Sequence, residues 1–291
     1  MPDDPRRERL RLGESALEIA LLDWGGEGPP VLLHHANGFC AALWAPVAEK
    51  LCSRFRVFAM DARGHGDSAK PAATAGNYSW ARFGADAAAV ADLLTQRHGR
   101  LPLAIGHSFG GTALVLAAIE RPHCFERLLL LDPVVLPSGA ARRARISRGH
   151  VLAEAARRRR AVWASRAEAR EAWAAKDMCA GWEPAALDLY VREGLRERDD
   201  GLFELKCSGE VEATIYENNL SVDVMALLPK LEAPAAVVWA RRGHFPRAHM
   251  EALASAMRRG VLREAPTGHF VPMEDPSWVV QEALAAQLSV G

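Results

Sequence analysis

One serine in the sequence stands where its hydroxyl group can act as a nucleophile. Ser108 lies in the stretch GHSFGG, between the apolar run 101–105 and the Ala- and Leu-rich segment 112–120. The run predicts a buried strand and the segment predicts a helix, so we expect Ser108 at the turn between them. Gly106 and Gly110 give the Gly-x-Ser-x-Gly spacing of a strained turn that lifts the hydroxyl above a sheet. The alternative is a glycine-rich turn whose serine caps a helix.

An alcohol is a poor nucleophile at neutral pH and needs a base within hydrogen-bonding distance. The candidate base is His269 in TGHFVPMEDP, which follows the last apolar run and precedes a predicted helix. A histidine in a surface turn is the alternative. His107 is expected to point away from the serine, because adjacent strand residues face opposite ways, and to brace the turn. His65 and Asp67, in RGHGDS, are also expected to brace a loop.

The elements that position these residues follow from apolar runs separated by Ala-rich segments of helical length. The chain has 291 residues, of which 49% are hydrophobic and 25% charged, as in an ordinary globular protein. Continuous rather than alternating hydrophobicity indicates strands covered on both faces, and hence a mostly parallel sheet. The fold class predicted is therefore α/β, with helices on both faces of the sheet. The predicted strands are 16–24, 30–35, 55–61, 101–107, 127–133, 235–240 and 260–266.

Composition excludes several classes of partner. The 36 basic and 36 acidic residues cancel, so no net charge favours nucleic acid or an anionic membrane. No apolar window is long enough for a membrane span, and the N-terminus lacks the apolar region of a signal peptide. Five scattered cysteines without a C-x-x-C pair predict reduced thiols and a cytoplasmic protein. No cluster of metal ligands is present, and we expect no metal.

The strand pattern stops in the middle of the chain. Residues 137–228 show no convincing strand and are predicted to form a helical cap inserted into a core made of 1–136 and 229–291. Segment 142–170 holds ten arginines and two glutamates, whereas 171–212 holds eleven acidic and five basic residues. We expect helix faces that partly neutralise each other rather than a nucleic-acid site. A second hypothesis is that the arginines attract a substrate with an acidic tail.

Four motifs at predicted strand ends occur in one order: HHANGF, DARGHGDSAKP, GHSFGG and TGHFVPMEDP. With these motifs the chain resembles the α/β-hydrolase-fold enzymes, in particular the serine esterase and lipase-like branch with a helical cap. The resemblance is strong over about 30–136 and 259–280, and weak through the cap. It implies that Ser108 is the nucleophile and His269 the general base.

The resemblance also implies two backbone donors for the oxyanion that forms on attack. One is the N–H group of Phe109, the residue after the nucleophile. The other comes from the loop after the second predicted strand, where the family commonly has His-Gly-X. Aligning on His35 makes Asn37 the donor, and aligning on Gly38 makes it Phe39. We favour Asn37 and keep Phe39 as the alternative.

The acid of a Ser-His-acid triad is missing from its usual place. Most relatives carry it just beyond the penultimate strand, where this chain reads VVWARRGHFPRAHM without a carboxylate. Some families place the acid one strand earlier, and this chain has LLLLDP there, so we expect Asp132 to be the acid. Asp132 as a mere turn residue is an alternative. Further alternatives are that Glu264 or Glu251 is the acid, or that the triad has no acid.

A serine nucleophile argues against the dehalogenase and epoxide hydrolase branches, which use a carboxylate. We therefore expect hydrolysis of an ester, thioester or lactone through an acyl-serine, without any cofactor. The expected substrate is a small molecule with an apolar acyl or alcohol part, bound by cap residues Trp163, Trp173 and Trp182. Alternatives on the same triad are an acyltransferase, a carbon–carbon bond hydrolase and a cofactor-free perhydrolase. A further alternative is a degenerate fold that only binds a ligand.

Overall fold

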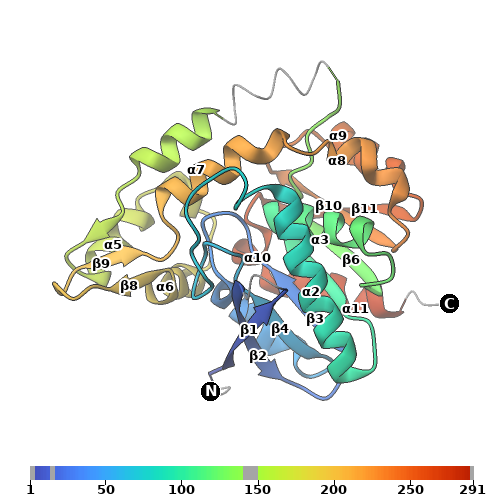
Figure 1. The fold of residues 1–291 in the computed structure, drawn as a ribbon, viewed down its shortest axis with the longest axis horizontal. Helices are drawn as coiled ribbons and strands as arrows, with labels where there is room; N and C mark the ends of the chain where they lie inside the picture. Colours follow the sequence, from blue (N-terminus) through green and yellow to red (C-terminus); the bar gives the residue numbers. More distant parts are fainter. Residues whose placement is uncertain (1–3, 14–16, 140–149, 289–291) are drawn as a thin grey trace.

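A central eight-stranded sheet organises the computed structural model, which describes residues 4–13, 17–139 and 150–288. Its strands are β1 (Arg6–Leu12), β2 (Leu17–Gly25), β3 (Pro30–His34), β4 (Arg56–Met60), β5 (Leu103–His107), β6 (Arg127–Leu131), β10 (Ala235–Arg242) and β11 (Gly260–Gly268). Their order across the sheet is β1-β2-β4-β3-β5-β6-β10-β11 (Figure 1). The six strands from β4 to β11 in this order run parallel, whereas β1 and β2 pair antiparallel. The mostly parallel α/β sheet predicted from the sequence is confirmed.

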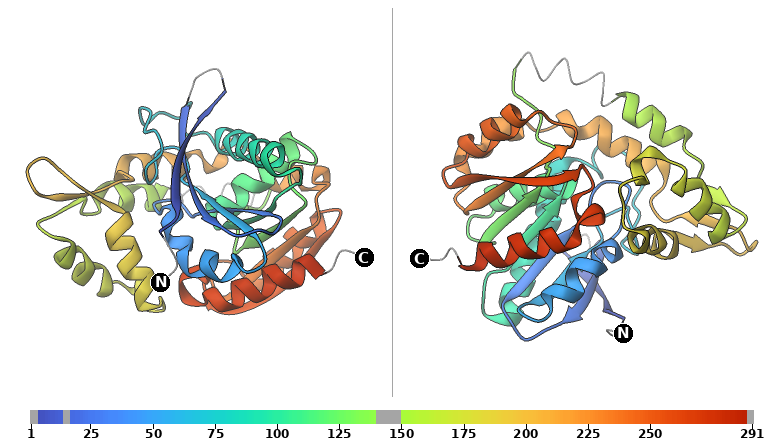
Figure 2. Two further views of the ribbon diagram at one scale, coloured as in Figure 1. Left: turned by 90° about the horizontal axis from the view of Figure 1, so that it is seen from below. Right: turned by 180° about the vertical axis from the view of Figure 1, so that it is seen from behind.

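Helices cover both faces of this sheet (Figures 1 and 2). They are η1 (Ala41–Trp44), α1 (Ala45–Leu51), α2 (Trp80–His98), α3 (Phe109–Glu120), α9 (Arg247–Ala256), α10 (Val271–Glu274) and α11 (Pro276–Leu288). In β6, Leu128 and Leu130 belong to the core shared with α2, α3 and α9, whereas Leu129 and Leu131 belong to the core on the side of α1 and α11. Burial on both faces explains why these strands read as continuous apolar runs.

Strand β1 was not predicted, although all seven predicted strands are present. Its sequence RRERLRL places only Leu10 and Leu12 in buried positions, and it pairs with β2 at the edge of the sheet. A strand with one solvent-exposed face lacks the continuous hydrophobicity on which the prediction relied.

The chain between β6 and β10 forms a group of elements beside the sheet (Figure 1). Residues 150–158 are helical. They are followed by β7 (Val162–Trp163), α5 (Arg166–Ala174), η2 (Asp177–Cys179), α6 (Pro184–Glu193), β8 (Leu195–Glu197), β9 (Phe203–Leu205), α7 (Gly209–Glu217), η3 (Asn218–Leu220), α8 (Val224–Leu227) and η4 (Leu228–Lys230). The expectation that this region has no strand is wrong, because β7, β9 and β8 form a small antiparallel sheet. Strands of two or three residues are too short to show a periodicity.

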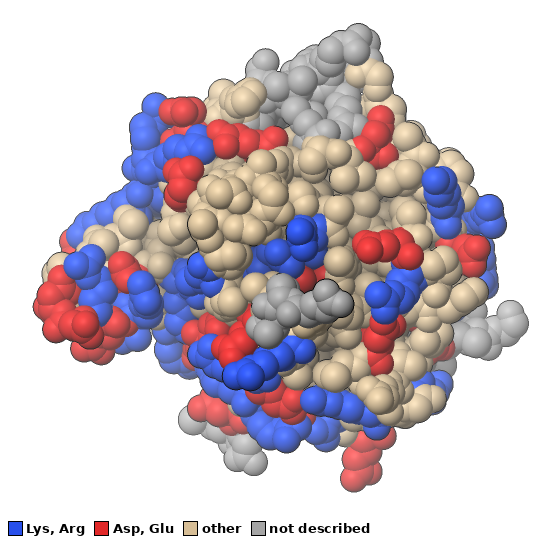
Figure 3. Space-filling view, in the orientation of Figure 1, with Lys and Arg blue, Asp and Glu red and all other residues tan. Residues whose placement is uncertain are grey.

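Ion pairs join the arginine-rich and acidic halves of this region. Arg157 pairs with Glu210 and Glu217, and Arg170 pairs with Asp188. Over α5, β8 and β9, at the left of Figure 3, basic and acidic side chains are interspersed. Most described arginines of this region therefore meet acidic partners within the same group of elements, whereas Arg166 packs over the ring of Phe203. The arginines at 142, 143, 145 and 148 lie outside the described residues.

Within the described parts of the chain, no helix is long and apolar enough to cross a membrane. The five cysteines are all free thiols: Cys40, Cys52, Cys124, Cys179 and Cys207.

Candidate active site

Ser108 occupies a strained turn between β5 and α3. Its backbone has φ 56° and ψ −120°, a region that residues other than glycine rarely adopt. A Cβ atom on Gly106 would lie 2.6 Å from the backbone of Gly111, and one on Gly110 would lie 2.4 Å from the carbonyl oxygen of His34. The two glycines therefore allow the backbone to pack closely around the serine, as the Gly-x-Ser-x-Gly spacing predicted.

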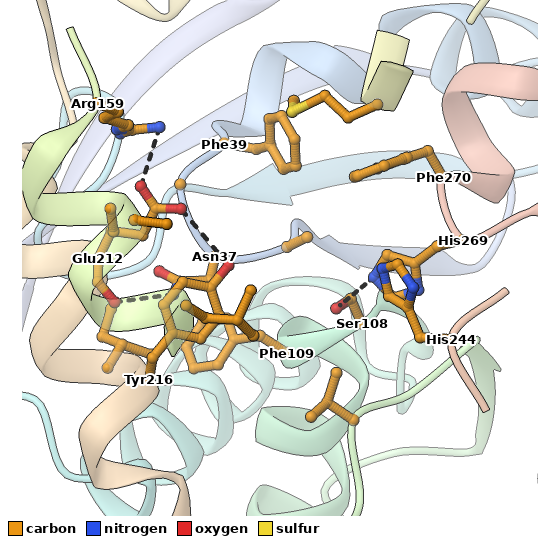
Figure 4. Close-up of a pocket in the computed structure, with 18 of the residues that line it drawn as sticks. Asn37, Phe39, Ser108, Phe109, Arg159, Glu212, Tyr216, His244, His269 and Phe270 are labelled. Atoms are coloured by element: carbon orange, nitrogen blue, oxygen red, sulfur yellow. Dashed lines mark hydrogen bonds and ion pairs between the residues drawn. The ribbon is translucent and has the colours of Figure 1, made fainter. Parts of the chain in front are cut away.

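His269 bridges the serine to a buried carboxylate. The distance from His269 Nε2 to Ser108 Oγ is 3.0 Å, and the distance from His269 Nδ1 to Asp132 Oδ2 is 2.5 Å. Asp132 is fully buried and its backbone has φ 43°, so it too is held in an uncommon conformation. Figure 4 shows Ser108 and His269 facing each other at one side of a cavity. The three predicted residues thus form one continuous hydrogen-bonded chain.

The topology of the sheet explains how they meet. Ser108 follows β5, Asp132 follows the adjacent strand β6, and His269 follows β11. All three strands are parallel, so their carboxyl ends share one edge of the sheet. The alternative acids lie on the surface instead, where Glu251 pairs with Arg247 and Glu264 pairs with Arg241 and Arg247.

The loop after β10, where most relatives carry the acid, packs against Asp132. The backbone N–H group of Ala240 lies 3.4 Å from Asp132 Oδ1. A Cβ atom on Gly243 would lie 2.7 Å from Asp132 Oδ2, so glycine permits this approach. The ring of His244 lies against that of His269, with 4.4 Å between the centroids and 32° between the planes. The loop therefore encloses the carboxylate rather than supplying one.

Burial controls the protonation of the pair. Loss of water lowers the pKa of His269 to about 4 and raises the pKa of Asp132 to about 6. Near neutral pH the imidazole is therefore uncharged and the carboxylate ionised. In that state His269 Nδ1–H donates to Asp132, and Nε2 is left to accept the proton of the Ser108 hydroxyl group.

His107 supports the histidine rather than the serine. Its Nε2 lies 2.8 Å from the carbonyl oxygen of His269, to which it donates. Burial lowers the pKa of His107 to about 3, so the ring is neutral. Through this hydrogen bond the side chain fixes the turn that carries His269.

The loop after β3 presents one backbone donor toward the cavity. The carbonyl oxygen of Ala36 accepts hydrogen bonds from His35 Nδ1 at 2.7 Å and from the N–H group of Phe39 at 3.2 Å. The backbone N–H group of Phe39 is therefore already hydrogen-bonded within the loop. In the trans peptide between Ala36 and Asn37, the N–H group points opposite to that carbonyl. No hydrogen bond to the N–H group of Asn37 is found among the described residues, and Asn37 lines the cavity.

His65 fixes the next peptide of this loop. Burial lowers the pKa of His65 well below its usual value, so its ring is neutral. Its Nδ1 donates to the carbonyl oxygen of Arg63, which leaves Nε2 to accept from the N–H group of Gly38 at 3.0 Å. His65 therefore braces a loop, as the sequence predicted. Asp67 pairs with Arg7 and Lys206 on a neighbouring surface.

The second backbone donor lies at the first residue of α3. The carbonyl oxygen of Ser108 accepts from the N–H groups of Thr112 and Val134, each at 3.3 Å. The opposite side of the same peptide carries the N–H group of Phe109, which as the first residue of a helix has no partner within the helix. Phe109 lines the cavity together with Asn37 and Ser108. Asn37 and Phe109 thus both line the cavity with Ser108, and no hydrogen bond from either backbone N–H group is found among the described residues.

The cavity has a volume of about 360 Å³ and a largely apolar lining. Of the three tryptophans expected to contact substrate, only Trp173 is among the lining residues. Trp163 packs against Trp173 with 5.1 Å between the ring centroids, and Trp182 packs behind Phe39 at 5.6 Å. Both therefore support the wall of the cavity rather than form its surface.

Sequence reasoning missed the charged residues of the cavity lining, which are Arg159, Arg160, Lys176 and Glu212. Arg159 and Glu212 line the cavity together with Tyr190 and Tyr216, and Arg159 Nη1 lies 2.9 Å from Glu212 Oε2. Arg159 stands within a run of four arginines, and no local signal marks it from its neighbours.

Comparison with known proteins identifies the family of this chain. A sequence profile described as the alpha/beta hydrolase family matches residues 31–282. An uncharacterised protein of Mycobacterium tuberculosis is 38% identical over 107 residues, which are 37% of this chain and 30% of that protein. N-formylmaleamate deformylase of Pseudomonas putida is 29% identical over 261 residues, which are 87% of each chain. The first curated relatives are matched over 30 to 46% of their own length.

Among solved structures, E-2-(acetamidomethylene)succinate hydrolase superposes with a TM-score of 0.82 at 18% identity, over 97% of this chain and 98% of that one. At this level of identity the likeness concerns the fold.

Proposed function

Since the chain belongs to the alpha/beta hydrolase family, we propose that it is a serine hydrolase that cleaves an ester, thioester or lactone through an acyl-serine intermediate. The observation that carries this proposal is the hydrogen-bonded chain from Ser108 through His269 to Asp132, which opens on a cavity. A protein that only binds a ligand has no use for two strained residues joined by a buried histidine. Enzymatic activity is therefore favoured over the degenerate binding fold.

In the acylation step, Ser108 Oγ attacks the carbonyl carbon while its proton passes to His269 Nε2. The resulting imidazolium is stabilised by the Asp132 carboxylate at 2.5 Å. The N–H groups of Asn37 and Phe109 are proposed to bind the oxyanion, because both line the cavity and Phe39 has used its donor elsewhere. Collapse of the intermediate breaks the bond to the alcohol or thiol, which takes the proton from His269.

In the deacylation step, His269 accepts a proton from a water molecule as the water oxygen attacks the acyl carbon. The second tetrahedral intermediate uses the same two backbone donors. It collapses to the carboxylic acid, and the proton on His269 returns to Ser108 Oγ. Every proton transfer is thus handled by one histidine, so the chemistry requires no metal or organic cofactor.

The region 137–228 is proposed to act as a cap that supplies most of the substrate-binding surface. Trp173, Leu205 and Tyr216 line the cavity and belong to this region, and they face Phe270 and Val134 of the core. These side chains suit an apolar acyl or alcohol part of a small substrate. The five free thiols support the additional proposal of a reducing compartment, the cytoplasm.

A second candidate reaction is removal of a short N-acyl group from an amide. The observation in its favour is the relative from Pseudomonas putida, which is named a deformylase and matches 87% of each chain. The proposed nucleophile, base and oxyanion donors would be the same, and His269 would protonate the leaving nitrogen.

Covalent labelling and turnover together test the proposal. Wild-type protein should react with a fluorophosphonate at Ser108, and Ser108→Ala should not. Ser53→Ala, at an exposed position outside the cavity, is the matched control and should label like wild type. Turnover of 4-nitrophenyl esters of increasing chain length, a lactone and an N-formyl amide would then rank the substrate classes. A folded wild-type protein that resists labelling and cleaves none of these compounds would refute the proposal.

A further inference from the structure

The cavity contains an internal ion pair at the side away from the serine. Figure 4 shows Ser108 and His269 at one side and Arg159 and Glu212 at the other, with Asn37 between them. Arg159 Nη1 lies 2.9 Å from Glu212 Oε2, and the side chains are 20% and 12% exposed. Arg159 also donates from Nη2 to the carbonyl oxygen of Cys207 at 2.9 Å. The guanidinium is therefore already paired and anchored before any ligand enters.

The Glu212 carboxylate lies directly over the loop that carries Asn37. A Cβ atom on Gly38 would be 3.0 Å from Glu212 Oε1. The side-chain Nδ2 of Asn37 donates to the backbone carbonyl oxygen of Glu212 at 3.1 Å. A carboxylate in this place opposes the oxyanion that the loop is proposed to stabilise, unless a cation neutralises it. Arg159 supplies that cation, so the two charges are needed together.

Arg159 and Glu212 together add no net charge to this end of the cavity. A second carboxylate, carried by a substrate, would meet Arg159 already occupied and Glu212 nearby, and like charges repel strongly where water is scarce. The neighbouring lining residue Arg160 pairs with Glu168, and Lys176 lies exposed at the surface. Lys176 lines the cavity without an ion pair to the described residues, but water screens its charge because the side chain is exposed.

Two polar atoms of the pair are still without hydrogen bonds. Arg159 Nε and Glu212 Oε2 are buried and have no hydrogen-bond partner among the described residues, although Oε2 lies 2.9 Å from Arg159 Nη1 in the ion pair. One of these atoms donates and the other accepts. Both atoms are closed to solvent, so a tail in the cavity meets the closed ion pair, and an uncharged tail avoids the repulsion from Glu212 that a carboxylate meets.

We propose that Glu212 is a specificity-determining residue, which by occupying Arg159 makes the enzyme select acyl substrates with an uncharged tail over those with a carboxylate tail. This inference rests on the proposed serine hydrolase function and replaces the expectation that the arginine-rich region favours an acidic substrate. Burial raises the pKa of Glu212, and Arg159 opposes that shift.

The test uses two 4-nitrophenyl esters of adipic acid that match in size, one with a free carboxylate and one with a primary carboxamide. Wild type should show a kcat/KM at least about tenfold higher for the carboxamide. Glu212→Gln releases Arg159, so the ratio should move toward the carboxylate by about ten- to a hundredfold, the usual size of a charged hydrogen bond. Glu210→Gln is the matched control, because Glu210 lies on the same helix α7 and pairs with Arg157 on the surface.

The double variant Arg159→Gln/Glu212→Gln separates the effect of the Arg159 charge from the effect of the changed side chain at 212. It keeps the amide side chain at 212 and removes the cation, so the gain for the carboxylate ester should disappear. If Glu212→Gln does not fold, the wild-type ratio and the double variant still decide. A wild type that cleaves the carboxylate ester as well as the carboxamide, or a folded Glu212→Gln with an unchanged ratio, would overturn the inference.

If the proposed hydrolase function is wrong, a binding measurement still tests the selectivity of the Arg159–Glu212 pair. If wild type cleaves neither ester and resists fluorophosphonate, calorimetry with hexanamide and hexanoate still measures the preference of the cavity without turnover. Tighter binding of hexanamide by wild type, reversed in Glu212→Gln, supports the selectivity of the pair. Equal or tighter binding of hexanoate by wild type contradicts it.

Discussion

Replacing Asp132 by asparagine changes a carboxylate to an amide of the same shape at the base of the hydrogen-bonded chain. The backbone N–H group of Ala240 lies 3.4 Å from Asp132 Oδ1 and fixes the orientation of the new amide, whose oxygen must face that donor. The NH₂ group then faces His269 Nδ1, at the position where Oδ2 lies 2.5 Å away. An NH₂ group only donates, so Nδ1 must accept the hydrogen bond. The imidazole therefore adopts the other tautomer, with Nε2 protonated.

That tautomer cannot accept the proton of Ser108, and no negative charge stabilises the imidazolium. In serine proteases the same change costs about 10⁴ in turnover, which corresponds to about 5 kcal/mol of transition-state stabilisation. We expect Asp132→Asn to lose at least about two to three orders of magnitude in kcat for a 4-nitrophenyl ester. Thermal unfolding followed by circular dichroism should show that the protein remains folded.

Glu251→Gln and Glu264→Gln are the controls, since both carboxylates pair with the surface residue Arg247 and neither lines the cavity. Each should keep kcat near the wild-type value. If folded Asp132→Asn turns over within about tenfold of wild type, Asp132 does not orient His269, and the assignment of the acid is wrong.

Two more predictions concern the surroundings of this pair. Gly243→Ala places a Cβ atom 2.7 Å from Asp132 Oδ2, so kcat should fall at least about tenfold in a folded protein; an unchanged kcat and melting temperature would show that the loop moves aside without cost. In a profile of kcat/KM against pH, protonation of the Asp132–His269 pair removes the base, so activity is lost as pH falls. Because burial sets the pKa of His269 to about 4 and that of Asp132 to about 6, the acidic midpoint should lie between these values, below the usual ~6.5 of histidine. A midpoint above 6.5 contradicts this.

The parallel sheet was predictable because its strands are buried on both faces. Burial on both sides turns a strand into a short continuous apolar run, and the chemistry-bearing residues follow such runs directly. The choice of Asp132 rested on the same reasoning, since it follows the strand after the serine and the loop 237–250 has no carboxylate. The structure adds that β6 lies beside β5, which brings Asp132 to the histidine.

The residues that line the cavity were harder to predict, because the direction of a side chain within a packed cluster depends on residues far away in the sequence. Trp163, Trp173 and Trp182 are all buried aromatic residues of one region, but only Trp173 reaches the cavity. Of the four successive arginines 157–160, Arg159 and Arg160 line the cavity, and Arg159 pairs there with Glu212, which lies far along the chain. Periodicity within a segment carries no information about such a partner.

The same contacts tie substrate selection to catalysis. Tyr190, on α6, donates from its hydroxyl group to the carbonyl oxygen of Gly38 at 3.1 Å, and the side chain of Asn37 donates to the backbone of Glu212 on α7. The loop that carries a proposed oxyanion donor is therefore held from the region that lines the cavity. We therefore expect a tail group that shifts α7 to shift the backbone N–H group of Asn37 as well, and with it the geometry at the carbonyl carbon. Binding energy from the tail then appears in kcat as well as in KM.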